Sequence, residues 1–287
     1  MPEQRIAELE AIAARLLDAI ARDEPPGPTA LTFLLRHYLA TGREDLGEAL
    51  GGALAGALAR GAADPDVTAR ARWLTLYAEA TTLSGDQRLL AAAGALVGSL
   101  RDEWPTLTAV AEAAASVDAC LRAAGIAGLV DPQDVVPAAI EQLEGIVGGA
   151  YQPGGGMASA IHGGRHARGT AADQVRPASA LLTAFEYSAR LPYSMLAEEL
   201  IQPARREPWA DADLIVHCEA ARVLCRLAAL HGDDEYRGAA VIAPDADYRG
   251  DADRILAAQS ARALAGVVDE AAAYGLALGE WLAVAGR

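Results

Sequence analysis

The positions at which helices are predicted to end recur along the chain at a regular spacing. Apolar residues recur every three or four positions, as in amphipathic helices, and each such stretch stops at a glycine or a short turn. The predicted ends are Gly42, Gly85, Gly125, a turn near Arg190, Gly232 and Gly275. The successive steps are 43, 40, 65, 42 and 43 residues. A period of this size is typical of stacked two-helix units. Six ends predict six hairpins and therefore an all-α fold, an (α/α)6 toroid or barrel.

The one long step contains an unusual segment, Tyr151–Gly169, with the sequence YQPGGGMASAIHGGRHARG. Its six glycines allow many backbone conformations. We therefore predict a single domain over residues 1–287, with a lid-like insertion at 151–169 that is mobile without ligand. At most a short strand pair is expected there.

Composition excludes several functions. The formal net charge of the 287-residue chain is -15, which disfavours nucleic acid and anionic membranes as partners. All 24 basic residues are arginine, so Schiff-base lysines and lysine-dependent phosphate loops are excluded. The amino terminus lacks the apolar core of a signal peptide, and no uncharged apolar run reaches the roughly 18 residues of a membrane span. With three cysteines and no Cys-x-x-Cys, the expected location is the cytoplasm.

Several stretches resemble a known family. LLRHYLATG and LYAEATTLSGD within residues 28–105, and later ADQVRPASALLTAFEYSA and ARVLCRLAALHGDDEYR, look like the helical part of thioredoxin-domain-containing proteins of the spermatogenesis-associated type. That part is similar to the barrels of N-acylglucosamine 2-epimerases and other six-hairpin sugar enzymes. We expect no thioredoxin-like domain before the barrel, and because the sequence also has no Cys-x-x-Cys, we expect no redox function. The resemblance implies a helical barrel, with His217 near a family asparagine position and Asp173 at an acidic one.

In such a barrel the longer loops lead into the inner helices, and the cavity opens on that side. The leading segments here are AADPDVTAR, EWPTLTA, residues 151–176 and EPWADADLIVH. Their Trp, Asp, Arg and His residues suit a small polar ligand such as a sugar. The predicted catalytic residues are His217, His166 and Asp173, and the predicted substrate-binding residues are Arg165, Arg176, Trp73, Trp209, Tyr151 and Glu219. Arg165, His166, Asp173 and His217 are expected to point into one space. No cofactor and no metal site are predicted, since His162 and His166 lack a nearby acidic ligand.

Three functions stay open at this point. The first is a sugar epimerase or isomerase that uses His166 and His217 as acid and base. The second is a non-catalytic barrel that binds a small ligand or a separate protein partner. The third is a glycoside hydrolase with paired carboxylates, for which the candidates are Asp64, Asp66, Asp173, Asp211 and Asp213. Structural roles also stay open: His217 as a hydrogen-bonded core residue beside a Glu219–Arg222 pair, and Asp173 as a helix cap.

Overall fold

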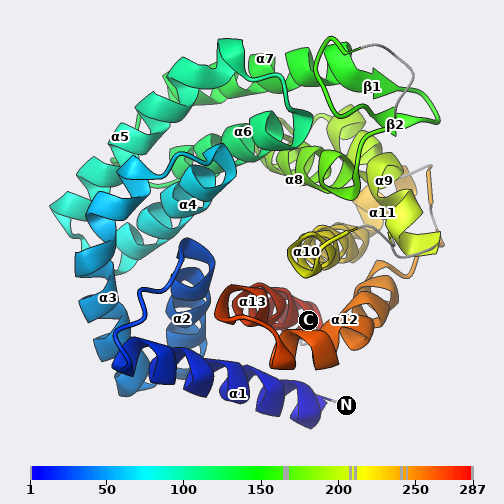
Figure 1. Cartoon of the computed structure of the whole chain (residues 1–287). Helices are drawn as coiled ribbons and strands as arrows, with labels where there is room; N and C mark the ends of the chain where they lie inside the picture. Colours follow the sequence, from blue (N-terminus) through cyan, green and yellow to red (C-terminus); the bar gives the residue numbers. More distant parts are fainter. Residues whose placement is uncertain are drawn as a thin grey trace. The chain divides into compact units, whose positions relative to one another are not determined.

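The computed structural model of the chain describes residues 2–163, 168–206, 209, 212–239, 242–243 and 245–285. Most of these residues lie in helices (Figure 1). By their internal contacts they divide into two compact units. The first unit comprises Met1–Ala57, Asp213–Ala239 and Pro244–Arg287, and the second comprises Leu58–Ala212 with Ala240–Ala243.

The first unit is a two-layer helical assembly centred on its last helix. Its helices are α1 (Pro2–Ala21), α2 (Pro28–Thr41), α10 (Leu214–His231), α11 (Asp234–Ala239), α12 (Tyr248–Ala265) and α13 (Val268–Ala285). Helix α13 packs against α1, α2, α10 and α12. Helix α3 (Glu44–Ala63) begins in this unit and continues into the second from Leu58 onward.

The second unit stacks consecutive helical pairs. Its elements are α4 (Val67–Ser84), α5 (Gln87–Glu103), the 3-10 helix η1 (Trp104–Thr106), α6 (Val110–Ala124), α7 (Pro132–Ala150), β1 (Tyr151–Gln152), β2 (Gly156–Met157), α8 (Ala171–Ser188) and α9 (Leu191–Arg206). Helices α4, α6 and α8 pack side by side, while α5, α7 and α9 each cover one of them. The short antiparallel pair of β1 with β2 lies within the predicted break and confirms that expectation.

Local sequence signals account for where these helices start and stop. The side chains of Asp66, Asp86, Asp131 and Asp213 each accept a hydrogen bond from an N–H in the first turn that follows them. Helices α2, α4 and α8 end in a left-handed residue, namely Gly42, Gly85 and Ala189, with φ of 68°, 61° and 52°. The predicted ends at Gly125 and Gly232 are also confirmed as C-caps, of α6 and α10.

The predicted helix end at Gly275 is wrong, because α13 runs through it to Ala285. A side chain at Gly275 would place its Cβ only 2.4 Å from the ring of Phe33 on α2. This glycine therefore permits two helices of the first unit to approach closely, and it does not end one. The sequence pattern alone does not distinguish these two uses of glycine.

Buried polar contacts tie the outer helices of the first unit to their neighbours. Arg5 and Glu8 of α1 both bond the fully buried Tyr274 hydroxyl, each at 2.6 Å. Arg15 donates to the carbonyls of Leu264 and Gly266, at 2.6 and 2.7 Å, where α12 ends. The last carbonyls of a helix have no partner within it, so Arg15 supplies one.

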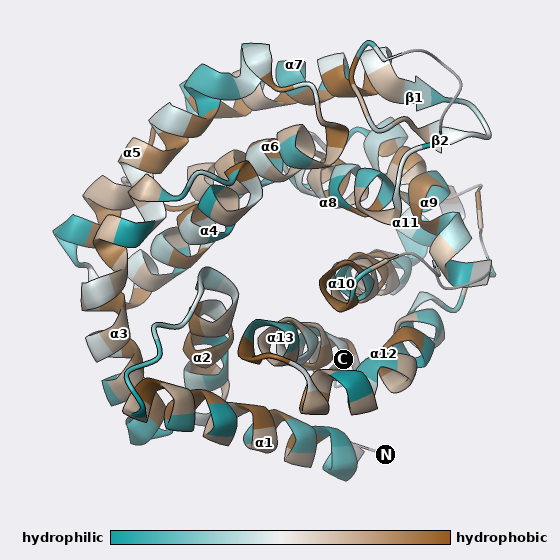
Figure 2. Ribbon diagram, in the orientation of Figure 1, coloured by the Kyte–Doolittle hydropathy of each residue, from teal (hydrophilic) through white to brown (hydrophobic). Residues whose placement is uncertain are grey.

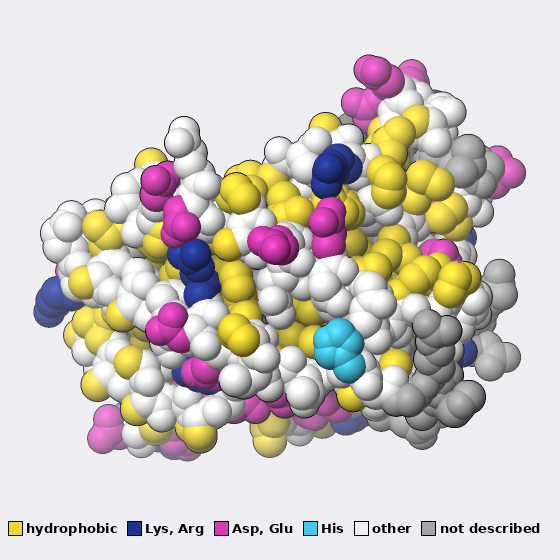
Figure 3. Space-filling view, turned by 90° about the horizontal axis from the view of Figure 1, so that it is seen from above, with side chains coloured by type: hydrophobic (Ala, Val, Ile, Leu, Met, Phe, Trp, Pro, Cys, Tyr) yellow, Lys and Arg dark blue, Asp and Glu magenta, His cyan; other side chains and the backbone are white. Residues whose placement is uncertain are grey.

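The apolar residues of the helices recur at the positions that packing buries. In α7 the buried residues Val135, Ala139, Leu143 and Ile146 recur every three or four positions, and Figure 2 shows hydrophobic and hydrophilic residues alternating along the helices. On the face seen in Figure 3, basic side chains are few and hydrophobic side chains are scattered among polar ones. Among the described residues, no helix combines the length and the apolar character that a bilayer crossing requires.

Candidate functional site

Four helices share an unusual burial pattern. Helices α4, α6, α8 and α10 are buried on nearly all sides, yet each carries one line of polar residues spaced three or four positions apart, which we call its polar stripe. Except for the buried Thr183, these residues are half-buried. The stripes comprise Arg72, Thr75 and Glu79 on α4; Asp118 and Arg122 on α6; Arg176, Ser179 and Thr183 on α8; and Glu219, Arg222 and Arg226 on α10. These polar residues mark the part of each helix that its neighbours leave partly exposed.

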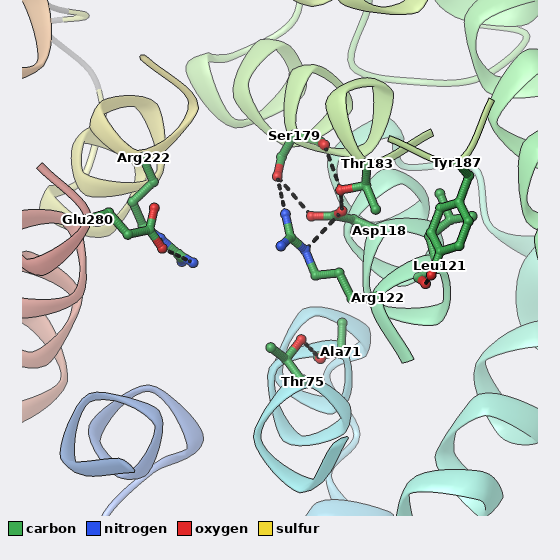
Figure 4. A network of polar contacts seen from close by, with 10 residues as sticks. All are labelled: Ala71, Thr75, Asp118, Leu121, Arg122, Ser179, Thr183, Tyr187, Arg222 and Glu280. Carbon is green, nitrogen blue, oxygen red and sulfur yellow. Dashed lines mark hydrogen bonds and ion pairs between the residues drawn. The ribbon is translucent and has the colours of Figure 1, made fainter. Parts of the chain in front are cut away.

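In the second unit the stripes of α6 and α8 meet at Asp118 (Figure 4). Its carboxylate accepts hydrogen bonds from the hydroxyls of Ser179, at 2.8 Å, and Thr183, and from the Arg122 guanidinium at 3.1 Å. We call these four residues the Asp118 cluster. The Asp118 side chain is 15% exposed and that of Arg122 is 31% exposed. The arginine and the two hydroxyls hold the carboxylate in a fixed orientation.

In the first unit, three helices bring together Arg36 of α2, Arg222 of α10 and Glu280 of α13, which we call the Glu280 cluster. Both guanidiniums bond the same carboxylate oxygen of Glu280, Arg36 through Nη1 at 2.7 Å and Arg222 through Nε at 2.9 Å. Figure 4 shows the side chains of Arg222 and Glu280 next to each other. The three side chains are 26–29% exposed. This cluster therefore joins two positive charges to one negative charge.

The start of α8 positions two of the predicted residues. Asp173 forms a capping box with Thr170, accepting from its N–H and its hydroxyl at 2.8 Å, and it also accepts from the N–H of Ala111 at 3.2 Å. These contacts give Asp173 the role of a helix cap, one of the two left open by the sequence. Arg176 lies one turn further along and donates to the Thr68 hydroxyl at 3.4 Å.

Tyr151 anchors the strand pair to α9. Its hydroxyl lies 2.8 Å from both carboxylate oxygens of Glu199, which also accepts from the N–H of Gly154 at 3.3 Å. Burial, and then the neighbouring Glu199 carboxylate, raise the pKa of Tyr151 to about 12. The hydroxyl is thus protonated at neutral pH and donates to the carboxylate.

Further anchors hold the described part of the predicted lid. The side-chain amide of Gln174 bonds both the N–H and the carbonyl of Met157 at 2.8 Å, as a neighbouring strand would. Ser159 and Ile161 bond backbone groups of Val110 and Thr108 at 3.1 and 2.8 Å. Residues 164–167, including the predicted Arg165 and His166, lie outside the described residues. The role of this segment as a lid stays a prediction.

His217 lies on a different face of α10 from the polar stripe. Its Nδ1 is 2.9 Å from the carbonyl oxygen of Asp213, and because a carbonyl only accepts, Nδ1 carries the proton. The residue is 5% exposed, and its Nε2 is buried with no hydrogen-bond partner among the described residues. At 3.6 residues per turn, His217 and Glu219 are separated by about 160° around the helix. Glu219 therefore lies on the stripe and His217 does not.

The two predicted tryptophans have different surroundings. Trp73 is 3% exposed; its Nε1 lies 3.4 Å from a carboxylate oxygen of Asp64, and the guanidinium of Arg60 lies 5.3 Å from its ring centre. It packs against Tyr77, so neighbours within the second unit cover it. Trp209 is half-buried, and its carbonyl accepts from the N–H of Ala212 at 3.2 Å.

The aspartates considered for hydrolysis have structural partners where the structure describes them. Asp66 and Asp213 cap helices α4 and α10, and Asp64 bonds the N–H of Asp66 at 3.1 Å. Asp211 lies outside the described residues. In the described part of the chain, no three or more His, Cys, Asp or Glu residues are grouped so that they could hold a metal ion.

Neither cluster was predicted from the sequence. Asp118, Arg222 and Glu280 lie within helices, whereas most of the predicted site residues lie in or beside the loops that lead into helices. A usable signal was present: polar residues recur at three- and four-residue spacing inside stretches that are otherwise rich in Ala, Leu and Val.

Comparisons with known proteins identify the fold. No family model and no curated protein matches the sequence, so the resemblance to the spermatogenesis-associated family stays a prediction. Among solved structures, the chain is similar to an unsaturated glucuronyl hydrolase specific for heparin, with a TM-score of 0.74, 11% identity and coverage of 100% of this chain and 99% of that chain. It is also similar to the GH76A alpha-1,6-mannanase from Salegentibacter sp. HEL1_6, with a TM-score of 0.64, 11% identity and coverage of 95% and 98%. These likenesses confirm the predicted fold class: the chain is all-α, of the α/α-barrel type.

Proposed function

We propose that this protein binds a small, polar, carbohydrate-like ligand and that the Asp118 cluster takes part in the binding. The observation that carries the proposal is the polar stripe, a line of carboxylate, guanidinium and hydroxyl groups on helices that are otherwise buried. Hydroxyl-rich ligands are bound by such groups, since carboxylates accept from sugar hydroxyls and arginines donate to ring and glycosidic oxygens.

The fold supports the choice of ligand class. The names of both similar structures refer to enzymes that act on carbohydrates. At 11% identity the likeness extends to the fold alone, so the carbohydrate enters here as part of the proposal.

The positions of the side chains rank the three functions that the sequence left open. Binding comes first, because it requires only the stripes. Hydrolysis comes second, because Asp118 supplies one of the two carboxylates that glycoside hydrolysis requires. Epimerisation by histidine comes last, because the Nε2 of His217 is buried on another face of α10.

The test starts with a thermal-shift screen of common mono- and disaccharides, followed by calorimetric titration of those that stabilise the protein. A bound sugar raises the melting temperature because it binds the folded state alone. Asp118→Asn keeps the size of the side chain and removes its charge, and we expect about tenfold weaker binding, as for the loss of one charged hydrogen bond. Circular dichroism checks that the variant is folded.

Asp66→Asn is the matched control, since asparagine caps a helix as well as aspartate does and Asp66 is not on a stripe. The control should bind like the wild type. The proposal fails if no sugar stabilises the protein at millimolar concentration, or if both variants bind as the wild type does.

A further inference from the structure

The Glu280 cluster has a charge balance unlike that of the whole chain. Across the 287 residues, 39 acidic side chains outnumber 24 arginines. The cluster itself holds two arginines, Arg36 and Arg222, against one glutamate, Glu280. A locally positive group in an acidic protein favours a negatively charged ligand.

The geometry of the cluster indicates which anion. Two guanidiniums from different helices converge on one carboxylate oxygen, at 2.7 Å from Arg36 and at 2.8 and 2.9 Å from two nitrogens of Arg222. A guanidinium presents its donors in a planar fork that matches a carboxylate. The arginine pair therefore already holds a carboxylate, and that carboxylate belongs to the protein.

The three side chains are neither free in solvent nor fully buried. Exposures of 26–29% leave them within reach of a small molecule. They are also shielded enough that an ion pair there is stronger than one in bulk water. Arg226, four residues beyond Arg222, adds a third positive charge one turn along the same stripe.

We propose that the Glu280 cluster binds a small molecule bearing a carboxylate, such as a sugar acid, and that Glu280 is the internal stand-in for the carboxylate of the ligand. The ligand competes with Glu280 for Arg36 and Arg222. This inference concerns the first unit alone and does not rest on ligand binding at the Asp118 cluster.

Competition between Glu280 and the ligand predicts that removing the Glu280 charge strengthens ligand binding. Glu280→Gln removes the competing charge but keeps the shape of the side chain, so a carboxylate ligand binds about tenfold more tightly. Arg222→Gln and Arg36→Gln each remove a charged donor, and binding weakens about tenfold or more. A residue that merely contacts the ligand or supports the fold would give weaker binding when replaced, and Glu280→Gln separates these roles by the sign of the change.

The probes are sodium D-glucuronate and D-glucose, which differ at one carbon, where a carboxylate replaces a hydroxymethyl group. Binding is measured by thermal shift and calorimetry at constant ionic strength. The matched control variants are Arg101→Gln and Asp134→Asn, which make the same charge changes at an ion pair between α5 and α7 in which Arg101 is 29% exposed and Asp134 is 62% exposed. They report any effect of net charge alone.

We expect glucuronate to bind and glucose to bind at least tenfold more weakly, with opposite effects of Glu280→Gln and Arg222→Gln and no effect of the controls. If acetate binds the wild type and these variants in the same pattern as glucuronate, the result also supports a carboxylate site, but it argues against a sugar as the ligand. The inference is overturned if glucuronate binds neither the wild type nor Glu280→Gln, or if Glu280→Gln weakens its binding. If both sugars bind equally and the variants do not change their binding, the inference is overturned, but the proposal that the protein binds a carbohydrate is not. If an arginine variant does not fold, the wild type and Glu280→Gln still decide the outcome.

Discussion

At the three left-handed helix ends, replacing glycine by alanine and alanine by glycine should change stability in opposite directions. Gly42, Gly85 and Ala189 occupy the same position after α2, α4 and α8, with φ of 68°, 61° and 52° and ψ of 16°, 15° and 20°. An L-residue in this conformation costs about 1–2 kcal/mol because its Cβ lies too near a carbonyl oxygen. Glycine avoids that cost but loses about 0.5–1 kcal/mol more conformational entropy on folding. The difference favours glycine by about 0.5–1 kcal/mol.

Ala189→Gly should therefore stabilise the protein by about 0.5–1 kcal/mol, and Gly42→Ala and Gly85→Ala should each destabilise it by a similar amount. No atom lies within 4 Å of a Cβ added at Gly42 or Gly85, so steric overlap does not contribute. For a chain of this size, each change shifts the melting temperature by about 1–3 °C. Urea unfolding, monitored by circular dichroism, measures the free energies directly.

Gly52→Ala is the matched control, because Gly52 lies within the exposed face of α3 and an added Cβ there also meets no atom within 4 Å. In a helix interior, alanine is favoured over glycine by about 0.5–1 kcal/mol. The same replacement should thus stabilise at position 52 and destabilise at position 42. Changes of the same sign at both positions would refute the reasoning from backbone conformation.

Four further predictions concern stability. Arg15→Met should lower the free energy of unfolding by about 1–3 kcal/mol, because the carbonyls at the end of α12 lose their donor, while Arg22→Met, at an exposed pair, should change it little; equal effects would contradict this role. The raised pKa of Tyr151 adds to the free energy of unfolding below pH 10, and this contribution is lost between pH 10 and about 12 because Tyr151 ionises first in the unfolded chain. Over that range Tyr151→Phe should lose less stability than the wild type in urea unfolding, and parallel pH profiles of the two proteins would argue against this. His217→Ala should lower the melting temperature and leave sugar binding unchanged, because its ring is buried away from the stripe; lost binding at unchanged stability would restore it as a ligand residue. The predicted single domain should unfold in one calorimetric transition, and two separate transitions would show that the units fold independently.

The helix ends were predictable where a residue has one structural use. Gly42 and Gly85 mark ends because they adopt left-handed backbone angles. Gly275 was misassigned because a glycine also serves where helices approach closely, and only the position of Phe33 reveals that use. Which helices approach each other is decided by long-range packing, and a single sequence does not specify it.

The site was harder to predict because candidate residues that lie beside loops have structural roles. Asp173 and Asp213 were candidate carboxylates of this kind, yet both cap helices. Asp118 and Arg222 look in the sequence like ordinary polar positions of amphipathic helices. Their significance arises because the rest of each helix is buried, so the stripe is the part that stays accessible. That distinction depends on how neighbouring helices cover each face.

A crystal structure of the protein soaked with the sugar that stabilises it most tests whether the Asp118 cluster binds the ligand. We expect the sugar to be bound with at least one hydroxyl hydrogen-bonded to the Asp118 cluster. A sugar bound elsewhere, for instance against Tyr151 and Glu199 with no contact to a polar stripe, would contradict it.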